Sequence, residues 1–411
     1  MRASSLAKSA GVWLNRFSVY FLLLSLLLFY VDFVVDVGNY KTLIYAAMFF
    51  LVLAFLSEPK SLLPVVQSKE ILFTSFVGVI LIGMAFLPLE VIRPHKLYLQ
   101  HLLYFVVLNV AIFYLLRLFS GNALERIWLL VVLLLAAGVL YQFQGYLAFK
   151  NVNSYFWNPH FLAQFCLFAL VGLSCFIIQC RRPWVVVFFL PLTFLALFLL
   201  IQSQSRPAWI AMLISLVVVF VIYLKDRWRL LGVVGVFALA GSCYLLFPKL
   251  VAYRFMSLID NLATEERVFI WNDALVMQSD VGLVGWFVGH GPGGMMEYFQ
   301  SDYNTFGHHI KFPHNFVLEV LFESGLIGLL SVVALYGFIF VLIHRAIKVS
   351  EASKETRLSL IVIFATMLSQ LIFTSITVPF YSKYVLLTQS PLIAMAIFLA
   401  GNRASQDSKA G

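Results

Sequence analysis

The residues best suited to chemistry lie in the segment HHIKFPHN (308–315), immediately before a long apolar stretch. His314 follows Pro313 and precedes Asn315, so a helix that begins here would hold the histidine at its N-terminus. Neutral imidazole is the usual general base near pH 7, and Asn315 could orient the ring or a substrate hydroxyl. The segment therefore predicts a general base, and the alternative is a histidine at an interface with no role in chemistry.

Two arginines in other polar segments are candidates for binding an anion. Arg206 lies in SQSRPAW (203–209), beside Ser205 and between two apolar stretches. A cation at a membrane surface favours an anionic partner, and the alternative is snorkelling to lipid headgroups. Arg267 lies in EERVFIWND (265–273), where a solvated salt bridge is the alternative. Two planar guanidinium groups would suit bidentate capture of a phosphate or pyrophosphate.

The stretch GHGPGG (289–294) formally satisfies the GxGxxG pattern of dinucleotide-binding folds. No buried strand precedes it and no helix clearly begins at its end, so it does not predict a nucleotide site. Gly291 and Gly293 are better explained by a tight turn that lets a backbone or a lipid-linked sugar approach closely. His309 and the other histidines nearby lack compact zinc spacings such as HExxH, so we expect neither a metal nor another cofactor.

The elements that must position these residues are apolar helices. The chain has 411 residues, of which 62% are hydrophobic and 11% charged, and its mean hydropathy is +0.95. Soluble domains average about 45–50% apolar and 25% charged residues. The net charge of +9 is scattered through loops, so membrane topology explains it better than nucleic-acid binding. We therefore predict an all-α polytopic membrane protein that forms a single integral membrane domain over residues 1–411.

Apolar runs near the roughly 20 residues that cross a hydrocarbon core recur along the whole chain. The first is expected to be a retained span rather than a signal peptide. About twelve spans are predicted, near residues 17–35, 41–56, 70–87, 98–117, 127–148, 161–180, 184–201, 208–224, 230–247, 316–343, 358–376 and 384–400.

The distribution of Lys and Arg predicts cytoplasmic N- and C-termini, because this orientation places most basic residues of the short loops inside. The one long hydrophilic segment, 248–313, is then a periplasmic loop. Within it, residues 263–278 have helical spacing and predict an amphipathic helix at the membrane interface. Its apolar face is expected to consist of Val268, Trp271, Leu275 and Val276.

Three sequence blocks, in this order and on one face, resemble the O-antigen ligase and O-antigen polymerase superfamily of bacterial envelope glycosyltransferases. They are SQSRPAW, then ERVFIWNDAL followed by GHGPGG, then FPHNFVLEVLFESGLIGLL. The hydropathy match covers nearly the whole chain, whereas the specific motifs cover only residues 203–330. The resemblance implies a metal-independent enzyme of the bacterial inner membrane that takes a glycan from an undecaprenyl-pyrophosphate carrier on the periplasmic side. In ligases of this superfamily the acceptor is the lipid A-core of lipopolysaccharide.

The resemblance also implies roles for particular residues. His314 would deprotonate the acceptor hydroxyl, and Arg206 and Arg267 would hold the pyrophosphate and stabilise its charge as it leaves. Direct attack would invert the sugar configuration. Further substrate contacts are expected from Asn315, Ser205, Gly291, Gly293 and His309.

Two alternatives to the ligase remain. Polymerases of the superfamily often carry two sizeable outward loops, and this chain has one, which favours the ligase. A transporter of a lipid-linked anion would also use many spans and outward cations. It predicts charged residues and broken helices near the middle of the membrane, where the predicted spans carry almost no charge.

Overall fold

All regular secondary structure in the part of the chain that the structure describes is helical. This computed structural model describes residues 2–35, 40–84, 86–87, 96–119, 122–149, 159–180, 182–246, 248, 256, 266–291, 293–296, 312–348 and 353–401. Nine helices in these ranges are long and apolar enough to cross a membrane. The prediction of an all-α polytopic membrane protein is confirmed, whereas the orientation in the membrane remains a prediction.

Each predicted span falls on a helix of the structure. The helices before the long loop are α1 Arg2–Val35, α2 Tyr40–Ser57, α3 Leu63–Val66, α4 Lys69–Met84, α5 Lys96–Leu118, α6 Asn122–Phe149, α7 Pro159–Cys180, α8 Pro183–Gln202, α9 Arg206–Tyr223 and α10 Asp226–Leu246, with the 3-10 turn η1 Pro59–Leu62. The later helices are α12 Glu266–Asp280, α13 Leu283–Val288, α15 Phe316–Lys348, α16 Lys354–Thr374 and α17 Lys383–Gly401. Helices α4, α6 and α17 lie on predicted spans but are not among the nine, so the count of twelve also remains a prediction.

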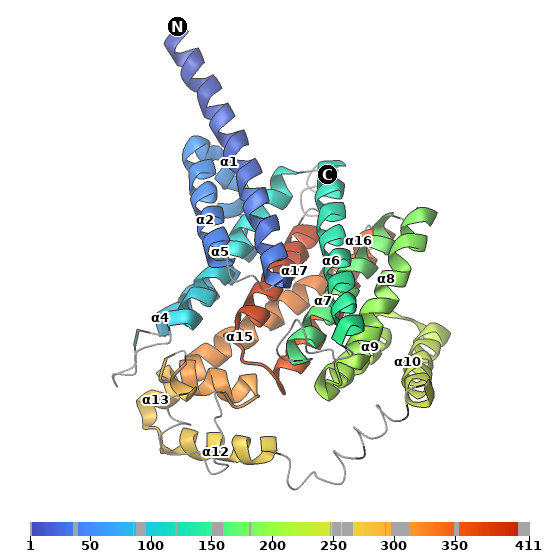
Figure 1. Cartoon of the computed structure of the whole chain (residues 1–411). Coiled ribbons are helices and arrows are strands. Elements are labelled where there is room, and N and C mark those ends of the chain that lie inside the picture. Colours follow the sequence, from blue (N-terminus) through green and yellow to red (C-terminus); the bar gives the residue numbers. More distant parts are fainter. Residues whose placement is uncertain are drawn as a thin grey trace.

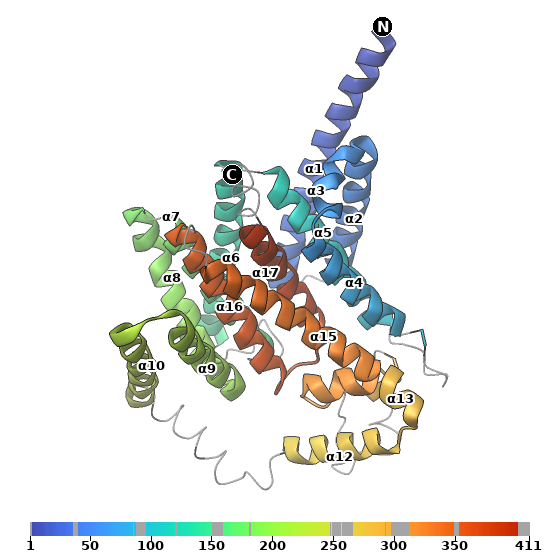
Figure 2. The ribbon, with the colours of Figure 1, turned by 180° about the vertical axis from the view of Figure 1, so that it is seen from behind.

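The long helices form one bundle, and the two helices of the long loop lie at one end of it (Figure 1). The start of α1 projects from the opposite end, and the reverse view shows the same arrangement (Figure 2). We call the end that carries α12 and α13 the loop end. It holds the start of α15 and the connection between α16 and α17, so the candidate residues are supported by the most central helices.

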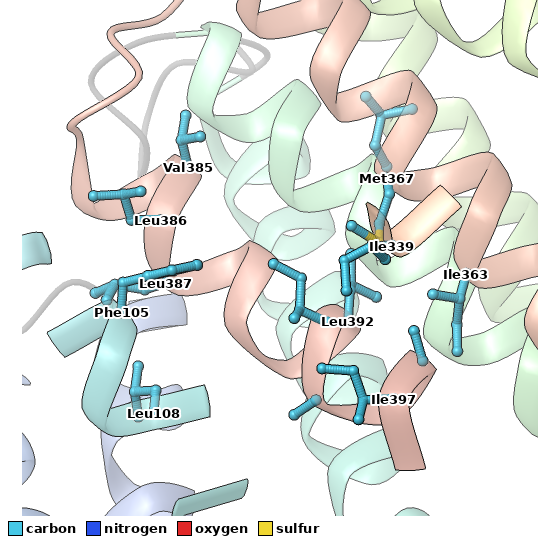
Figure 3. Packing of buried hydrophobic residues seen from close by; sticks show 14 of the residues in the cluster. Phe105, Leu108, Ile339, Ile363, Met367, Val385, Leu386, Leu387, Leu392 and Ile397 are labelled. Carbon is cyan, nitrogen blue, oxygen red and sulfur yellow. The ribbon is translucent and has the colours of Figure 1, made fainter. Parts of the chain in front are cut away.

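Helix α17 is the centre of the packed core. Figure 3 shows its side chains between Phe105 and Leu108 of α5 on one side and Ile363 and Met367 of α16 on the other, and all four are buried. Lipid tails are as apolar as these side chains, so close packing rather than escape from water stabilises helix contacts inside a membrane. The helices that hold the loop end are therefore fixed by a tight apolar contact below it.

Helix α15 is broken near the loop end. Gly325 has φ +63 and ψ −172, so its backbone is not helical. A Cβ there would lie 2.3 Å from the carbonyl carbon of Phe287 in α13, a contact that only glycine avoids. The break frees backbone carbonyls in the first turns of α15 for partners from the long loop.

Helix α12 is the amphipathic helix predicted over 263–278, and residues 263–265 lie outside the described part. Its predicted apolar face is largely exposed to the surroundings, with Leu275 at 55%. The opposite face packs on α15 through Ile270, Ala274 and Met277, which cluster with Phe322. The helix is therefore apolar on two sides. One side contacts the protein, and the location of the other at the membrane interface remains a prediction.

Candidate active site

His314 is held by a backbone carbonyl from a distant part of the chain. Its Nδ1 lies 2.6 Å from the carbonyl oxygen of Thr377, in the connection between α16 and α17. A carbonyl oxygen only accepts, so Nδ1 carries the hydrogen and Nε2 of the neutral ring keeps its lone pair. The ring also packs against Phe312, with centroids 4.5 Å apart. His314 has φ +53, an uncommon conformation for a residue other than glycine. The geometry leaves Nε2 as the atom that can take a proton.

The pKa of His314 lies below the usual histidine value. Burial of the ring is the largest cause, and the positive charge of Arg267 acts in the same direction. The hydrogen bond to Thr377 and the carboxylate of Glu266 raise the pKa and oppose these effects in part. Since the net shift is downward from about 6.5, the ring is mostly neutral near pH 7. It is therefore in the form that a general base requires.

Helix α12 brings Arg267 to His314. Trp271, one helical turn after Arg267, donates from its indole nitrogen to the carbonyl oxygen of Pro313 at 2.9 Å. Residues four apart lie on the same face of a helix. The Trp271 contact thus orients the Arg267 face of α12 toward the segment that carries His314, consistent with the effect of the Arg267 charge on the ring.

Asn315 caps α15. Its side-chain oxygen accepts from the backbone N–H groups of Val317 at 3.0 Å and Leu318 at 3.3 Å. Asparagine is among the best N-cap residues because its oxygen satisfies amides that lack a partner at a helix start. The predicted contact of Asn315 with substrate therefore remains a hypothesis in which only its amide nitrogen is available.

The Arg206 block lies at the same end of the bundle. Ser205 and the Nδ1 of His160, at the start of α7, are 3.0 Å apart and share a hydrogen bond. The ring of His160 packs 6.3 Å from that of Phe373 near the end of α16. The hydroxyl of Thr377 in turn donates to the carbonyl oxygen of Phe373 at 2.5 Å. This chain of contacts connects Ser205, next to Arg206 in the sequence, to the residue that holds His314.

The Gly-rich turn is docked on the break in α15. The backbone amides of His290 and Gly291 donate to the carbonyls of Phe322, at 2.9 Å, and Glu323, at 2.7 Å. The carboxylate of Glu323 accepts from the amides of Gly293 and Met295. The group that approaches the Gly-rich turn closely is therefore the backbone of α15. A backbone was one of the two possibilities that the sequence left open, and a lipid-linked sugar was the other. The backbone amides of Gly291 and Gly293, the two glycines predicted to contact substrate, both donate to Glu323. A substrate could therefore bind there by close approach to the glycines but not by accepting from their N–H groups.

Two buried glutamates near His314 were missing from the sequence-based site. Glu319 is 1% exposed and Glu323 2%, one turn apart on α15. Glu319 accepts from the backbone amides of Phe380, at 2.9 Å, and Tyr381. A signal was present, because two acids four residues apart in an apolar stretch are costly in a membrane and mark a specific use.

The described residues offer no cluster for a metal ion, since no group of three His, Cys, Asp or Glu side chains among them could hold one. His309 lies outside the described residues, so its predicted contact with substrate remains a prediction. The described site offers an imidazole with a pKa that burial lowers and a guanidinium group with a positive charge that acts on the same ring.

Comparisons with known proteins cover the segment that carries these residues. A family model described as O-Antigen ligase matches residues 191–333, which include all three motif blocks. A curated relative, the O-antigen ligase of Pseudomonas aeruginosa (strain PAO1), is 34% identical over 155 residues. That alignment covers 37% of this chain and 34% of the relative, so the chain matches about a third of the relative's length.

Proposed function

We propose that the chain is an O-antigen ligase of the O-antigen ligase and polymerase superfamily, a proposal supported by the family model that matches residues 191–333 and by the 34% identical relative. It would transfer a glycan from an undecaprenyl-pyrophosphate carrier to the lipid A-core of lipopolysaccharide, at the periplasmic face of the bacterial inner membrane. The observation that carries the proposal is the His314 geometry. Its Nδ1 is bonded to Thr377, its Nε2 is left as the base, and Arg267 lies close enough to affect its charge.

The reaction would proceed in one displacement. Nε2 of His314 takes the proton of an acceptor hydroxyl, and the oxygen attacks the anomeric carbon of the glycan. The bond between that carbon and the phosphate oxygen breaks, and undecaprenyl pyrophosphate leaves with the electron pair. Arg206 and Arg267 stabilise the negative charge that develops on the leaving group, a role that needs no metal. Direct attack inverts the anomeric configuration.

Polymerisation is the second candidate, because the superfamily contains both activities. The names of the matching family model and of the relative favour ligation, as does the single long loop. Lipopolysaccharide from a deletion strain distinguishes the two on a gel. Loss of a ligase leaves core without O-antigen, whereas loss of a polymerase leaves core with a single repeat unit.

The same deletion strain tests whether His314 is the general base. Complementation with wild type should restore the O-antigen ladder, whereas His314→Ala should reproduce the deletion pattern at equal protein level. His344→Ala is the matched control, because His344 lies near the other end of α15, where its ring packs against Tyr223. A normal ladder with His314→Ala would exclude His314 as the base.

Transport is a candidate from a different class, and the break in α15 at Gly325 is a feature that it predicts. This break lies near the loop end rather than in the middle of the helix, and the Gly-rich turn fills it. Purified protein in detergent separates the classes when it is mixed with a lipid-linked oligosaccharide and O-antigen-free lipopolysaccharide. Only an enzyme forms the joined product without two compartments.

A further inference from the structure

We propose that Glu319 is a positioning residue that fixes the carbonyl of Thr377 and, through it, the orientation of His314. The inference rests in part on the proposed function, because it assigns how the proposed base is held. Glu319 follows His314 by five residues and is fully enclosed by protein. Its carboxylate binds the backbone of the connection that also binds His314.

The connection between α16 and α17, residues 375–382, needs such an anchor. It is not helical, yet most of it is buried, including Thr377 and Phe380. Buried backbone amides without hydrogen-bond partners destabilise a fold, so these amides need acceptors. Glu319 satisfies the amide of Phe380 at 2.9 Å and that of Tyr381. A carboxylate is the strongest acceptor that a side chain offers to an N–H group.

The contacts form a closed circuit. The chain runs from His314 along α15 to Glu319, which binds Phe380. The chain then runs from Phe380 back to Thr377, whose carbonyl binds His314. Two short stretches of chain and two hydrogen bonds thus form a closed loop of contacts that includes the proposed base. Release of either bond lets the Thr377 carbonyl move relative to the imidazole.

Other anchors hold the far part of the same connection. The Nδ1 of His101 in α5 donates to the carbonyl oxygen of Tyr381 at 2.9 Å. The Tyr381 hydroxyl lies 2.5 Å from that of Ser324, beyond the first turns of α15. These contacts keep the connection attached when Glu319 is changed, so a local shift rather than unfolding is the expected effect.

Glu323 provides a matched control on the same helix. It is equally buried, one turn further along α15, but its carboxylate binds Gly293 and Met295 of the long loop. The two carboxylates therefore share burial and helix and differ in the segment that they hold. Of the two carboxylates, Glu319 is the one that accepts from backbone amides of the connection that holds His314.

Among the described residues, the charged groups that act on His314 belong to α12, which presents Arg267 and Glu266. The groups that face Glu319 are Glu323 on its own helix and the hydroxyls of Tyr98 in α5 and Tyr381. None of these groups is altered by substitution of Glu319. A change at His314 would therefore report the movement of the connection.

The experiment compares Glu319→Ala, Glu319→Gln and Glu323→Ala in the full-length protein in detergent. Diethylpyrocarbonate labels neutral imidazole, and mass spectrometry measures the labelling of His314 against pH without any need for activity. In Glu319→Ala we expect the apparent pKa of His314 to rise toward the ordinary value and labelling to become faster. Release of the connection uncovers the ring, which raises the pKa, and removes the Thr377 hydrogen bond, which lowers it. Burial is the larger of the two effects, so the expected net change is a rise. Glu323→Ala should leave the apparent pKa at the wild-type value.

Glu319→Gln should behave like wild type, because its amide oxygen can accept from the same backbone N–H groups. The other carboxylate oxygen of Glu319 has no hydrogen-bond partner among the described residues, so the amide nitrogen replaces an atom that makes no such contact. Transfer of a lipid-linked oligosaccharide to O-antigen-free lipopolysaccharide provides the second readout. Glu319→Ala should lower kcat by about 10²-fold with little change in KM, as expected for a misplaced catalytic group.

The proposal is overturned if His314 in Glu319→Ala labels with the wild-type rate and apparent pKa. It is also overturned if Glu319→Gln is as impaired as Glu319→Ala, since the charge rather than the position would then matter. Failure of the proposed function is distinguishable, because an active His314→Ala enzyme excludes the base while the labelling still reports whether Glu319 holds the ring.

Discussion

Two segments beside the first turns of α15 are held in opposite ways. In the His314 segment, 312–315, Nδ1 of the ring is bonded to Thr377, no bond to Nε2 is found within the described residues, and the ring is only partly covered. In the Gly-rich turn, 289–294, successive backbone amides are bonded to α15 and three of the glycines are buried. Both segments are conspicuous in the sequence. The difference is that the described part of the structure leaves Nε2 of His314 without a hydrogen bond, as a base requires, whereas the Gly-rich turn is explained by contact between two backbones.

The largest expected effect separates the histidines of the two segments. His314→Ala should lower kcat/KM by about 10²–10⁴-fold, the usual contribution of a general base, with little change in thermal stability. His290→Ala should lower the unfolding temperature, because the buried His290 ring stacks on Phe322 at 4.5 Å. Transfer kinetics measure the loss of kcat/KM, and thermal unfolding in detergent measures the stability of both variants. Comparable stability losses in the two variants would break the comparison.

In the His314 segment, Arg267 is expected to contribute to catalysis through its positive charge. Arg267→Ala should lower kcat by about 10²–10³-fold if the guanidinium stabilises the leaving group. The positive charge of Arg267 lowers the pKa of His314. Its removal favours the imidazolium form, so the acidic limb of the kcat/KM profile should move to higher pH. Arg267→Lys should keep that limb near its wild-type position, and an unmoved limb in Arg267→Ala would place Arg267 away from the base.

Gly289 tests the Gly-rich turn. It has φ +79, and a Cβ there would lie 2.5 Å from the backbone of Glu323 and Gly325. Gly289→Ala should therefore destabilise the protein by about 1–3 kcal/mol, the usual cost of a strained backbone position. Gly282→Ala is the control, because Gly282 has negative φ and open space around its Cβ position. Equal unfolding temperatures for the two variants would refute the docking of this turn.

Asn315 carries the smallest expected effect. Asn315→Ala should cost about 1 kcal/mol through loss of the helix cap, whereas Asn315→Asp should preserve stability because aspartate caps equally well. Transfer assays on the Asp variant then show whether the side chain has a second use. Full activity would limit Asn315 to capping, and loss of activity at unchanged stability would support its predicted contact with substrate.

The predictable part of the site follows from local patterns. Apolar length predicted the helices, and the polar blocks predicted His314, Arg206 and Arg267 as candidates, since such side chains are costly beside a membrane. The orientation of Arg267 toward His314 depends on the Trp271 contact with Pro313, residues far apart in the chain. No local pattern reveals such a pairing. Asn315 shows the reverse limit: its place beside a candidate base predicts a contact with substrate, and nothing in that local pattern reveals that its oxygen also caps α15.

Sequence alone determined that this protein is a bundle of apolar helices with its candidate base at the start of one of them, because hydropathy and side-chain chemistry are local properties. Only the tertiary structure decided which ring nitrogen of His314 is available. That choice depends on the backbone carbonyl of Thr377, which is 63 residues away. The type of side chain at a position does not reveal what its backbone carbonyl binds. It also decided the use of Glu319 and Glu323. Their partners are backbone amides, which every residue except proline carries, and only folding selects among them.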